Sequence, residues 1–374
     1  MAKENLIIIM IDGGRFDYGL NSKVFQEVEK TSVFFSNSIT YGPHTIAAMH
    51  AVFSGCYGTR TGTNSYWSTY DFKKESFVTL TEYLSSNGYF TSADLINELV
   101  VPKQGFDEYI VHDEINDDLT LRHKKILSKI QTKNQKGQPS FLYLHYSKIH
   151  TGIMNEVLKK YDNFSDEFFD NPDQNKNRYE KLFISAENYL KTILEEIKKL
   201  GLDDNSLILI MSDHGVSVGE KFGERAYGAF CYDYTLKTIT HFISKKFQSK
   251  RITQQVRTID FMPTILQFLK IPLDNTKEPL DGVSLMPLIN NKKIDEQFAY
   301  SETGNPLKEK QPPKIPNVMS IRNSNWKLIY NLHNDSKEMY NLLEDPLELK
   351  NLIGTNNEIE SMLWNELLKI QQSN

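Results

Sequence analysis

The sequence has few cysteines and no long hydrophobic run. Its 374 residues include only two cysteines, Cys56 and Cys231, which excludes a disulfide framework and a thiolate metal cage. No stretch approaches the roughly 18 consecutive apolar residues that a membrane-spanning helix needs. The apolar run at residues 6–11 is interrupted by Asp12 and is too short for the hydrophobic region of a secretion signal. We therefore expect a cytoplasmic protein with no membrane span, in which both thiols are buried.

The sequence also lacks an excess of charge of one sign. It contains 43 lysines and arginines against 48 aspartates and glutamates, a formal net charge of -5, so no basic surplus indicates a nucleic-acid polymer as partner. Hydrophobic residues make up 39% and charged residues 24%, which is typical of a folded globular chain. An anionic substrate would have to be captured by local groups. The composition does not determine the oligomeric state.

What the sequence does contain is a set of short, continuous apolar runs. Residues 6–11, 140–146 and 206–211 have the composition of strands buried on both faces of a parallel sheet. Residues 182–200 repeat apolar side chains every three or four positions, which predicts an amphipathic helix. Strands that alternate with such helices indicate an α/β fold. Residues 159–178 are polar and carry no strand pattern, so we expect an insertion there.

The C-terminal part has a different pattern. Four of the 13 prolines fall within residues 302–317, too many for a helix or a central strand. Residues 318–330 then alternate like a β-hairpin, and residues 359–370 predict a final helix. We therefore predict one large α/β domain at residues 1–300 and a small α+β subdomain at residues 301–374 that packs on it.

Charged side chains follow two of the predicted strands. Asp12 ends the first strand, and Asp213 and His214 follow the third. Because parallel strands present their carboxyl ends at one edge of a sheet, these side chains should lie close together. A single aspartate at a strand end is more often a turn residue. Two carboxylates and an imidazole together suit a divalent cation such as zinc or manganese.

Thr45 has two candidate roles. Residues 42–55 have the pattern of a loop that enters a helix and ends at a glycine, with Thr45 at the expected N-cap position. Its hydroxyl could simply cap the helix. Alternatively it is a nucleophile, because a helix N-terminus offers positive potential and backbone donors to an anionic group.

These residues carry a resemblance to a known family. The sequence resembles the sulfatase-type members of the alkaline phosphatase superfamily along nearly its whole length. The matching segments, in order, are residues 5–20 (NLIIIMIDGGRFDYGL), 45–62 (TIAAMHAVFSGCYGTRTG), 201–215 (GLDDNSLILIMSDHG), 256–266 (VRTIDFMPTIL) and 338–352 (EMYNLLEDPLELKNL). The resemblance implies an alkaline-phosphatase-like sandwich, in which helices flank a mostly parallel central sheet.

The resemblance also implies roles for individual residues. One divalent metal ion would be held by Asp12, Thr45, Asp213 and His214. Zinc or manganese is favoured, and calcium and magnesium remain open. Thr45 would also be the nucleophile. Asn64 lies near a substrate-contacting asparagine of the nucleotide pyrophosphatase/phosphodiesterase branch.

The sequence departs from the sulfatase pattern at the nucleophile. Sulfatases carry a cysteine that is converted to formylglycine where this chain has Thr45, and a following arginine is replaced by Met49. A formylglycine hydrate can expel sulfate by returning to the aldehyde, whereas a threonine ester must be cleaved by water at the central atom. That second route is normal for phosphoryl enzymes and difficult for sulfuryl enzymes, so Thr45 favours a phosphorus ester.

A further departure lies in residues 144–150 (LHYSKIH), where Lys148 replaces a family aspartate that helps hold a second metal ion. We therefore expect a single metal ion. Lys148 and His150 would bind the non-bridging oxygens of the substrate or protonate the leaving group. Lys221 and Arg225 follow the Asp-His-Gly segment and are further candidates for substrate binding. Each of these cations could equally be an ordinary surface or loop side chain.

The function that these residues predict is hydrolysis of a small anionic ester with the help of a metal ion. The ester would be a phosphodiester, a phosphomonoester or a phosphonate ester, and the reaction would pass through a covalent phospho-threonine at Thr45. Three alternatives stay open. They are a sulfate-ester hydrolase with the same site, a phosphotransferase acting on glycan or lipid head groups, and a catalytically degenerate binding protein.

Overall fold

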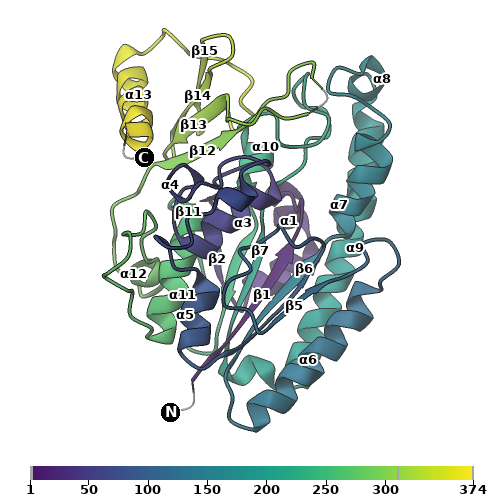
Figure 1. Ribbon diagram of the computed structural model, residues 1–374. Helices are drawn as coiled ribbons and strands as arrows, with labels where there is room; N and C mark the ends of the chain where they lie inside the picture. Colours follow the sequence, from purple (N-terminus) through teal and green to yellow (C-terminus); the bar gives the residue numbers. More distant parts are fainter. Residues whose placement is uncertain (1–2, 310, 373–374) are drawn as a thin grey trace.

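The fold is built around one large β-sheet (Figure 1). In the computed structural model, which describes residues 3–309 and 311–372, eight strands form this sheet in the order β10-β2-β9-β7-β1-β6-β4-β5. β1 (Asn5–Ile11) lies parallel between β6 (Ser140–Tyr146) and β7 (Ser206–Ser212). β9 (Thr240–Ile243) is antiparallel to both of its neighbours. The three predicted buried strands and the mostly parallel sheet are confirmed.

Smaller elements complete this part of the molecule. The remaining strands of the sheet are β2 (Val33–Phe35), β4 (Phe90–Leu95), β5 (Glu108–Val111) and β10 (Lys250–Ile252). A separate small sheet holds β3 (Ser38–Ile39), β8 (Lys237–Thr238) and β11 (Val256–Arg257). The helices are α1 (Phe16–Asn21), α2 (Lys23–Glu29), α3 (Thr45–Ser54), α4 (Gly58–Thr61), α5 (Leu80–Ser86), α6 (Leu119–Gln135), α7 (Lys148–Ile153), α8 (Asp166–Phe169), α9 (Pro172–Lys199), α10 (Asp233–Leu236), α11 (Phe261–Leu269), α12 (Met286–Ile289) and α13 (Asn357–Gln372).

Helices cover both faces of the central sheet (Figure 1). Leu6 and its alternate residues in β1 pack in one buried cluster with α3, α5 and α11. Ile7 and its alternate residues pack in a second cluster with α2, α6 and α9. Because both faces of β1 are covered, all seven of its residues are buried. This is why the strand is a continuous apolar run and does not alternate with polar residues.

Helix α9 is longer than the sequence pattern predicted, because it begins at Pro172 and not at residue 182. Proline is well suited to the first turn of a helix, where its missing N–H has no partner to lose. Asn175 and Tyr179 in this first part are buried, but the side chains around them are mostly polar and exposed. The apolar stripe is therefore too sparse to read from the sequence, and the predicted insertion at residues 159–178 is partly helical.

The C-terminal part is an antiparallel sheet with one helix against it. Its four strands, in order, are β12 (Ala299–Thr303), β13 (Val318–Arg322), β14 (Trp326–Asn331) and β15 (Ser336–Asn341). The predicted hairpin is confirmed as β13 and β14, and the predicted final helix as α13. The sequence pattern did not reveal β12 or β15. Since β12 begins at Ala299, the predicted boundary at residue 301 falls inside a strand of this sheet.

The C-terminal part packs against helix α3. One buried cluster joins Ala47 and Ala51 of α3 to Tyr300 of β12 and to Leu363 and Leu367 of α13. Helix α3 is thus held between the central sheet on one side and the C-terminal sheet and helix on the other. The position of its first residue depends on both contacts.

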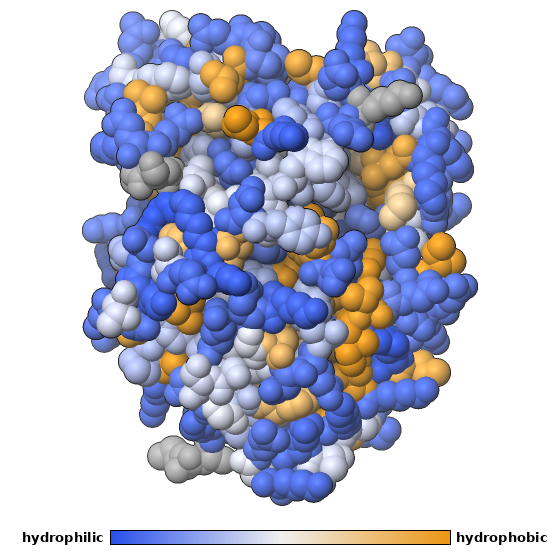
Figure 2. All heavy atoms as spheres, viewed as in Figure 1, coloured by the Kyte–Doolittle hydropathy of each residue, from blue (hydrophilic) through white to orange (hydrophobic). Residues whose placement is uncertain are grey.

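The helices were compared with the length and apolar character of a membrane span. Within residues 3–309 and 311–372, no helix combines the length and the apolar character needed to cross a membrane. On the face shown in Figure 2, hydrophobic side chains form one column to the right of centre and smaller groups elsewhere among hydrophilic ones. Cys56 and Cys231 are buried free thiols, as predicted.

We expect the substitution Leu363→Ala to destabilise the protein, because Leu363 is fully buried between α13 and the C-terminal sheet. Truncation of a buried leucine costs about 2–5 kcal/mol of unfolding free energy. Leu347→Ala is the matched control, since Leu347 is 71% exposed, and it should change the free energy by about 0.5 kcal/mol or less. Urea unfolding of both variants measures this. Equal losses in the two would show that α13 does not contribute to the core.

Candidate active site

The residues predicted to bind a metal converge at one edge of the central sheet. Asp12 follows β1, and Asp213 and His214 follow β7. The three side chains are buried, and one ligand atom from each lies within 4.8 Å of those of the others. Thr45 is the first residue of α3, and its Oγ1 lies 3.4 Å from both Asp12 Oδ2 and His214 Nε2. The four residues therefore meet at one point, as their predicted roles require.

Thr45 is not the N-cap of α3, which corrects the expectation from the sequence. The N-cap is His44, whose ring accepts a hydrogen bond from the N–H of Ala47 at 3.5 Å. Burial lowers the pKa of His44 to about 3, so the ring is neutral and can act as an acceptor. Because His44 takes this role, the hydroxyl of Thr45 contacts Asp12 and His214 instead.

Asp12 is a buried carboxylate, and histidine nitrogens lie near both of its oxygens. His145 Nε2 lies 3.0 Å and His150 Nδ1 3.6 Å from Oδ2, and His214 Nε2 lies 3.8 Å from Oδ1. Burial alone would raise the pKa of Asp12, but the charge of His150 and the hydrogen bonds of His150 and His145 hold it well below its usual range. The carboxylate is therefore ionised in the folded protein.

Asp213 and His214 each present a ligand atom to this group. Asp213 Oδ1 accepts hydrogen bonds from the N–H groups of Gly13 and His214, at 3.1 and 2.9 Å. Among the described residues, Asp213 Oδ2 and Asp12 Oδ1 are buried and have no hydrogen-bond partner. His214 Nδ1 donates to the carbonyl of Gly215 at 2.7 Å, so its Nε2 carries a lone pair. Such unpaired buried atoms fit a divalent cation.

The backbone after β1 is shaped for this arrangement. Gly13 has a φ of 72°, in the left-handed region that favours glycine. A Cβ at this position would lie 3.1 Å from a side-chain carbon of Val216 and 3.4 Å from one of Ile149. The tight turn brings the N–H of Gly13 to Asp213 Oδ1, and this hydrogen bond links the end of β1 to the end of β7.

His150 lies beside the group, as the sequence prediction for it requires, and a tyrosine contacts it. The hydroxyl of Tyr227 lies 3.3 Å from His150 Nδ1, and the Tyr227 ring lies 4.7 Å from the ring of His214 between centroids. Burial alone would lower the pKa of His150, but the charge and hydrogen bond of Asp12, together with the charges of Asp213 and Glu114, raise it to about 9. Tyr227 was not predicted from the sequence, because a tyrosine in an irregular loop forms part of no pattern.

A cavity of about 600 Å³ adjoins this group. Its lining includes His44, Tyr66, Tyr161, Arg225 and Tyr227, so it begins beside Thr45 and His214 and continues along aromatic side chains. A volume of this size holds a small organic molecule. Arg225 donates from Nη1 to Asn163 Oδ1 at 2.5 Å, and its buried Nε has no partner among the described residues. Arg225 is thus a cationic donor in the wall of the cavity.

Lys148 and Lys221, both predicted to bind substrate, make their polar contacts elsewhere. Lys148 Nζ donates to the backbone carbonyls of Glu114 and Ile115, at 2.8 and 3.3 Å, in the segment before α6. Lys221 Nζ donates to the carbonyl of Glu348 and lies 4.5 Å from the ring centroid of Tyr232. Backbone carbonyls distant in the sequence thus hold both ammonium groups, and the predicted contact of these lysines with substrate stays a prediction.

Asn64 lies in the loop that follows α4. Its N–H and Oδ1 contact the hydroxyl of Ser68, at 3.0 and 3.4 Å. The next two residues, Ser65 and Tyr66, line the cavity. Asn64 is therefore close in sequence to the cavity wall, and its predicted contact with substrate stays a prediction.

His145 is a further residue of the site that the sequence analysis did not single out. It contacts Asp12 because β6 pairs with β1, and this register places Met10 beside His145. Its position in an apolar strand was the available signal, since a histidine in a strand buried on both faces needs a polar partner. The identity of that partner depended on the strand order.

The fold and the site together define the class of this protein. Asp12, Thr45, Asp213 and His214 gather at one edge of a mostly parallel sheet. The chain belongs to the sulfatase family, whose model matches residues 4–271. A second model, described as the C-terminal part of N-sulphoglucosamine sulphohydrolase, matches residues 229–373.

Two curated proteins are related in sequence. The chain is 28% identical over 220 residues to the uncharacterized sulfatase YdeN of Escherichia coli strain K12, which covers 57% of this chain and 36% of that protein. It is 26% identical over 120 residues to an extracellular sulfatase SULF-1 homolog of Drosophila melanogaster, which covers 31% of this chain and 10% of that protein. The matches thus span well under two thirds of either relative's length.

Solved structures share the fold over nearly the whole chain. BT4656, solved in complex with its substrate D-glucosamine-2-N,6-O-disulfate, superposes with a TM-score of 0.77 at 17% identity over 100% of this chain and 99% of that one. The phosphonate monoester hydrolase of Agrobacterium radiobacter gives a TM-score of 0.76 at 12% identity over 99% and 96%. The family match favours the sulfate-ester alternative over the phosphoester that Thr45 suggested first.

A buried carboxylate organises the loop that carries Arg225. Glu224 Oε1 accepts hydrogen bonds from the N–H groups of Ala229 and Phe230, at 2.8 and 2.9 Å, and Oε2 accepts one from the hydroxyl of Tyr234 at 2.6 Å. Burial raises the pKa of Glu224 from 4.5 to about 7, although the three hydrogen bonds lower it. Folding therefore favours the protonated acid at this position.

Glu224 should make the stability of the protein depend on pH. Because the pKa in the folded state is raised, its stabilising contribution is present below pH 4.5 and is lost as the pH rises through about 7. The change amounts to roughly 3 kcal/mol of unfolding free energy. Glu224→Gln cannot ionise, so we expect its stability relative to the wild type to increase by up to that amount over this interval.

Urea unfolding at several pH values measures this difference. The exposed Glu358→Gln variant, on α13, is the control and should follow the pH profile of the wild type. Parallel profiles for wild type and Glu224→Gln would mean that Glu224 is ionised in the folded protein at all these pH values.

Proposed function

We propose that this chain hydrolyses a small anionic ester of a tetrahedral phosphorus or sulfur centre, with Thr45 as the nucleophile. The observation that carries the proposal is the position of Thr45 Oγ1, 3.4 Å from both Asp12 Oδ2 and His214 Nε2 at the N-terminus of α3. The hydroxyl thus lies beside groups that fit a cation and in the positive potential of a helix end. Both favour an anionic substrate and a nucleophilic oxygen.

The residues would act in two displacements. In the first, Thr45 Oγ1 forms a bond to the central atom, the bond to the leaving oxygen breaks, and that oxygen takes up a proton. In the second, a water oxygen attacks the same atom and releases the acid together with the Thr45 hydroxyl. A divalent cation held by Asp12, Asp213, His214 and Thr45 would supply stabilisation of the negative charge on the reacting oxygens.

Two cationic or protonated side chains support this sequence of steps. His150 lies 3.6 Å from Asp12 Oδ2, close enough to the reacting centre to donate a proton to the leaving oxygen. Arg225 lines the adjoining cavity with an unpartnered buried Nε and can donate to an anionic group there. The aromatic walls of the same cavity would receive the leaving group.

The proposal also names the central atom of the ester, which is either phosphorus or sulfur. Membership in the sulfatase family favours a sulfate ester. Thr45 favours a phosphorus ester, because a threonine has no aldehyde from which sulfate could be expelled. We propose the phosphorus ester as the substrate class and keep the sulfate ester as the second candidate.

A substrate panel decides between these candidates. Aryl phosphate, phosphodiester, phosphonate and sulfate esters would be tested with manganese, zinc, calcium or magnesium. Turnover of the sulfate alone would overturn the phosphorus assignment. Product found only when an acceptor alcohol is present would indicate a phosphotransferase. Binding of the esters without any turnover would indicate a degenerate binding protein.

Removal of the nucleophile should abolish turnover. Thr45→Ala is expected to lower kcat by roughly 10³-fold or more, because no oxygen remains to form the intermediate. Thr45→Ser keeps a hydroxyl and should retain measurable turnover. Thr192→Ala, which removes an exposed hydroxyl from α9, is the control and should match the wild type. Unchanged kcat in Thr45→Ala would refute the nucleophile assignment.

Arg225 should contribute to substrate binding. Arg225→Gln removes the cationic donor from the cavity wall, and loss of a charged hydrogen bond lowers kcat/KM by about 10- to 100-fold. We expect most of this change in KM. Arg251→Gln, which removes an arginine that pairs with Glu29 and does not line the cavity, provides the control. If KM were equal in wild type and Arg225→Gln, the substrate would not reach this part of the cavity.

A further inference from the structure

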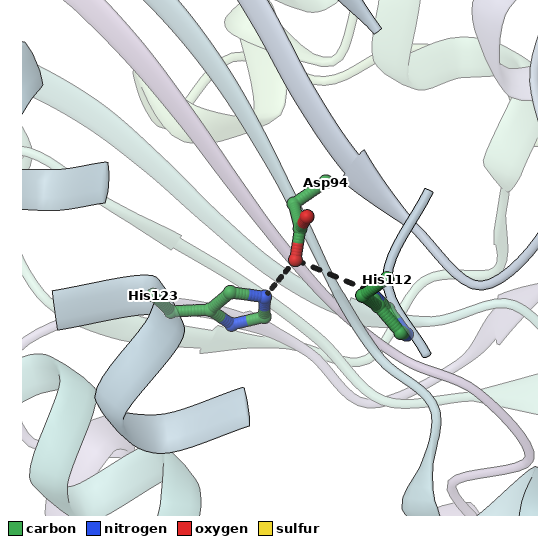
Figure 3. Close-up of side chains that lie close together, drawn as sticks. All are labelled: Asp94, His112 and His123. Atoms are coloured by element: carbon green, nitrogen blue, oxygen red, sulfur yellow. Dashed lines mark hydrogen bonds and ion pairs between the residues drawn. The ribbon is translucent and has the colours of Figure 1, made fainter. Parts of the chain in front are cut away.

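A second group of buried ligand side chains lies outside the reacting centre. Asp94 near the end of β4, His112 just after β5 and His123 in α6 point toward one another (Figure 3). Their exposed fractions are 0%, 4% and 0%. One ligand atom from each lies within 4.8 Å of those of the other two. The proposed reaction uses none of these side chains.

The spacing of these atoms is close to that of a zinc tetrahedron. His123 Nε2 lies 2.9 Å and His112 Nδ1 3.2 Å from Asp94 Oδ2. Around a tetrahedral zinc ion with bonds of about 2.0–2.1 Å, neighbouring ligand atoms are about 3.3 Å apart. Small outward movements of the two imidazoles would therefore place the three atoms at three corners of such a site and leave the fourth to water.

The outer partners of these side chains are those that metal ligands require. His112 Nε2 lies 2.9 Å from the hydroxyl of Ser147, and His123 Nδ1 lies 2.6 Å from the hydroxyl of Tyr189. If His112 Nδ1 and His123 Nε2 bind a metal, each ring can donate its other N–H to that hydroxyl. Arg122 Nε donates to both carboxylate oxygens of Asp94, at 2.8 Å to Oδ1 and 3.0 Å to Oδ2, which orients the carboxylate.

We propose that Asp94, His112 and His123 form a zinc site separate from the predicted cation site at Asp12. Two imidazoles with one carboxylate favour zinc, whereas calcium and magnesium prefer oxygen ligands. The ion would join the ends of β4 and β5 to α6. It would also hold His112 against Ser147, the residue before α7, which carries His150. The site is a positioning element, and the proposal does not rest on the proposed reaction.

Zinc binding by the full chain tests the proposal. Wild type and variants would be stripped of metal with a chelator, dialysed against zinc and analysed for zinc content by mass spectrometry. We expect the wild type to hold one zinc ion more than His123→Gln, and we expect this ion to persist in Asp213→Asn, where the predicted active-site cation loses a ligand. Calcium or magnesium should not replace it.

Matched variants make the result decisive. His241→Gln alters another buried histidine, which contacts Ser32 outside both groups, and should keep the ion. No zinc in Asp213→Asn, or equal zinc in His123→Gln and wild type, would overturn the proposal and leave Asp94 as a hydrogen-bond acceptor only. The first of these outcomes does not depend on the folding of His123→Gln. Ester turnover is not measured, so the proposed function and this site can fail separately.

Discussion

The site depends on two buried carboxylates, Asp12 and Asp213, that the parallel pairing of β1 with β7 holds at one point. Ile11 lies beside Ser212 in this register, so the next residues of both strands emerge together. Like charges in a buried position repel each other, and burial together with Asp12 raises the pKa of Asp213 against the lowering effect of His214. Backbone N–H groups and histidines offset part of this cost, and unpaired oxygens remain for a cation.

The proposed hydrolysis of an anionic ester requires positive potential in a mildly acidic chain. The net charge is -5, so the positive potential at the site has to be local. It comes from the N-terminus of α3, from His150 and Arg225, and from the cation that the carboxylates fit. Because α3 is packed between the central sheet and the C-terminal part, the position of Thr45 depends on a hydrophobic contact far from the chemistry.

The sequence predicted the elements whose pattern is strong and missed those whose pattern is weak. The strands at residues 6–11, 140–146 and 206–211 were identified because both faces of each are covered, which makes them continuously apolar. The start of α9 was missed because polar residues surround Tyr179. Lys148 was assigned to the substrate from its place in a motif, whereas carbonyls 33 and 34 positions away bind its ammonium group.

By itself, the sequence determined the buried strands, the charged residues at their ends and the threonine at the start of α3, because burial and chain position alone decide these features. The tertiary structure decided which side chains meet. Asp94, His112 and His123 lie far apart in the chain and meet because β4 and β5 are neighbours and α6 packs beside them. Strand order and helix packing arise from contacts between distant segments, and local periodicity does not encode them.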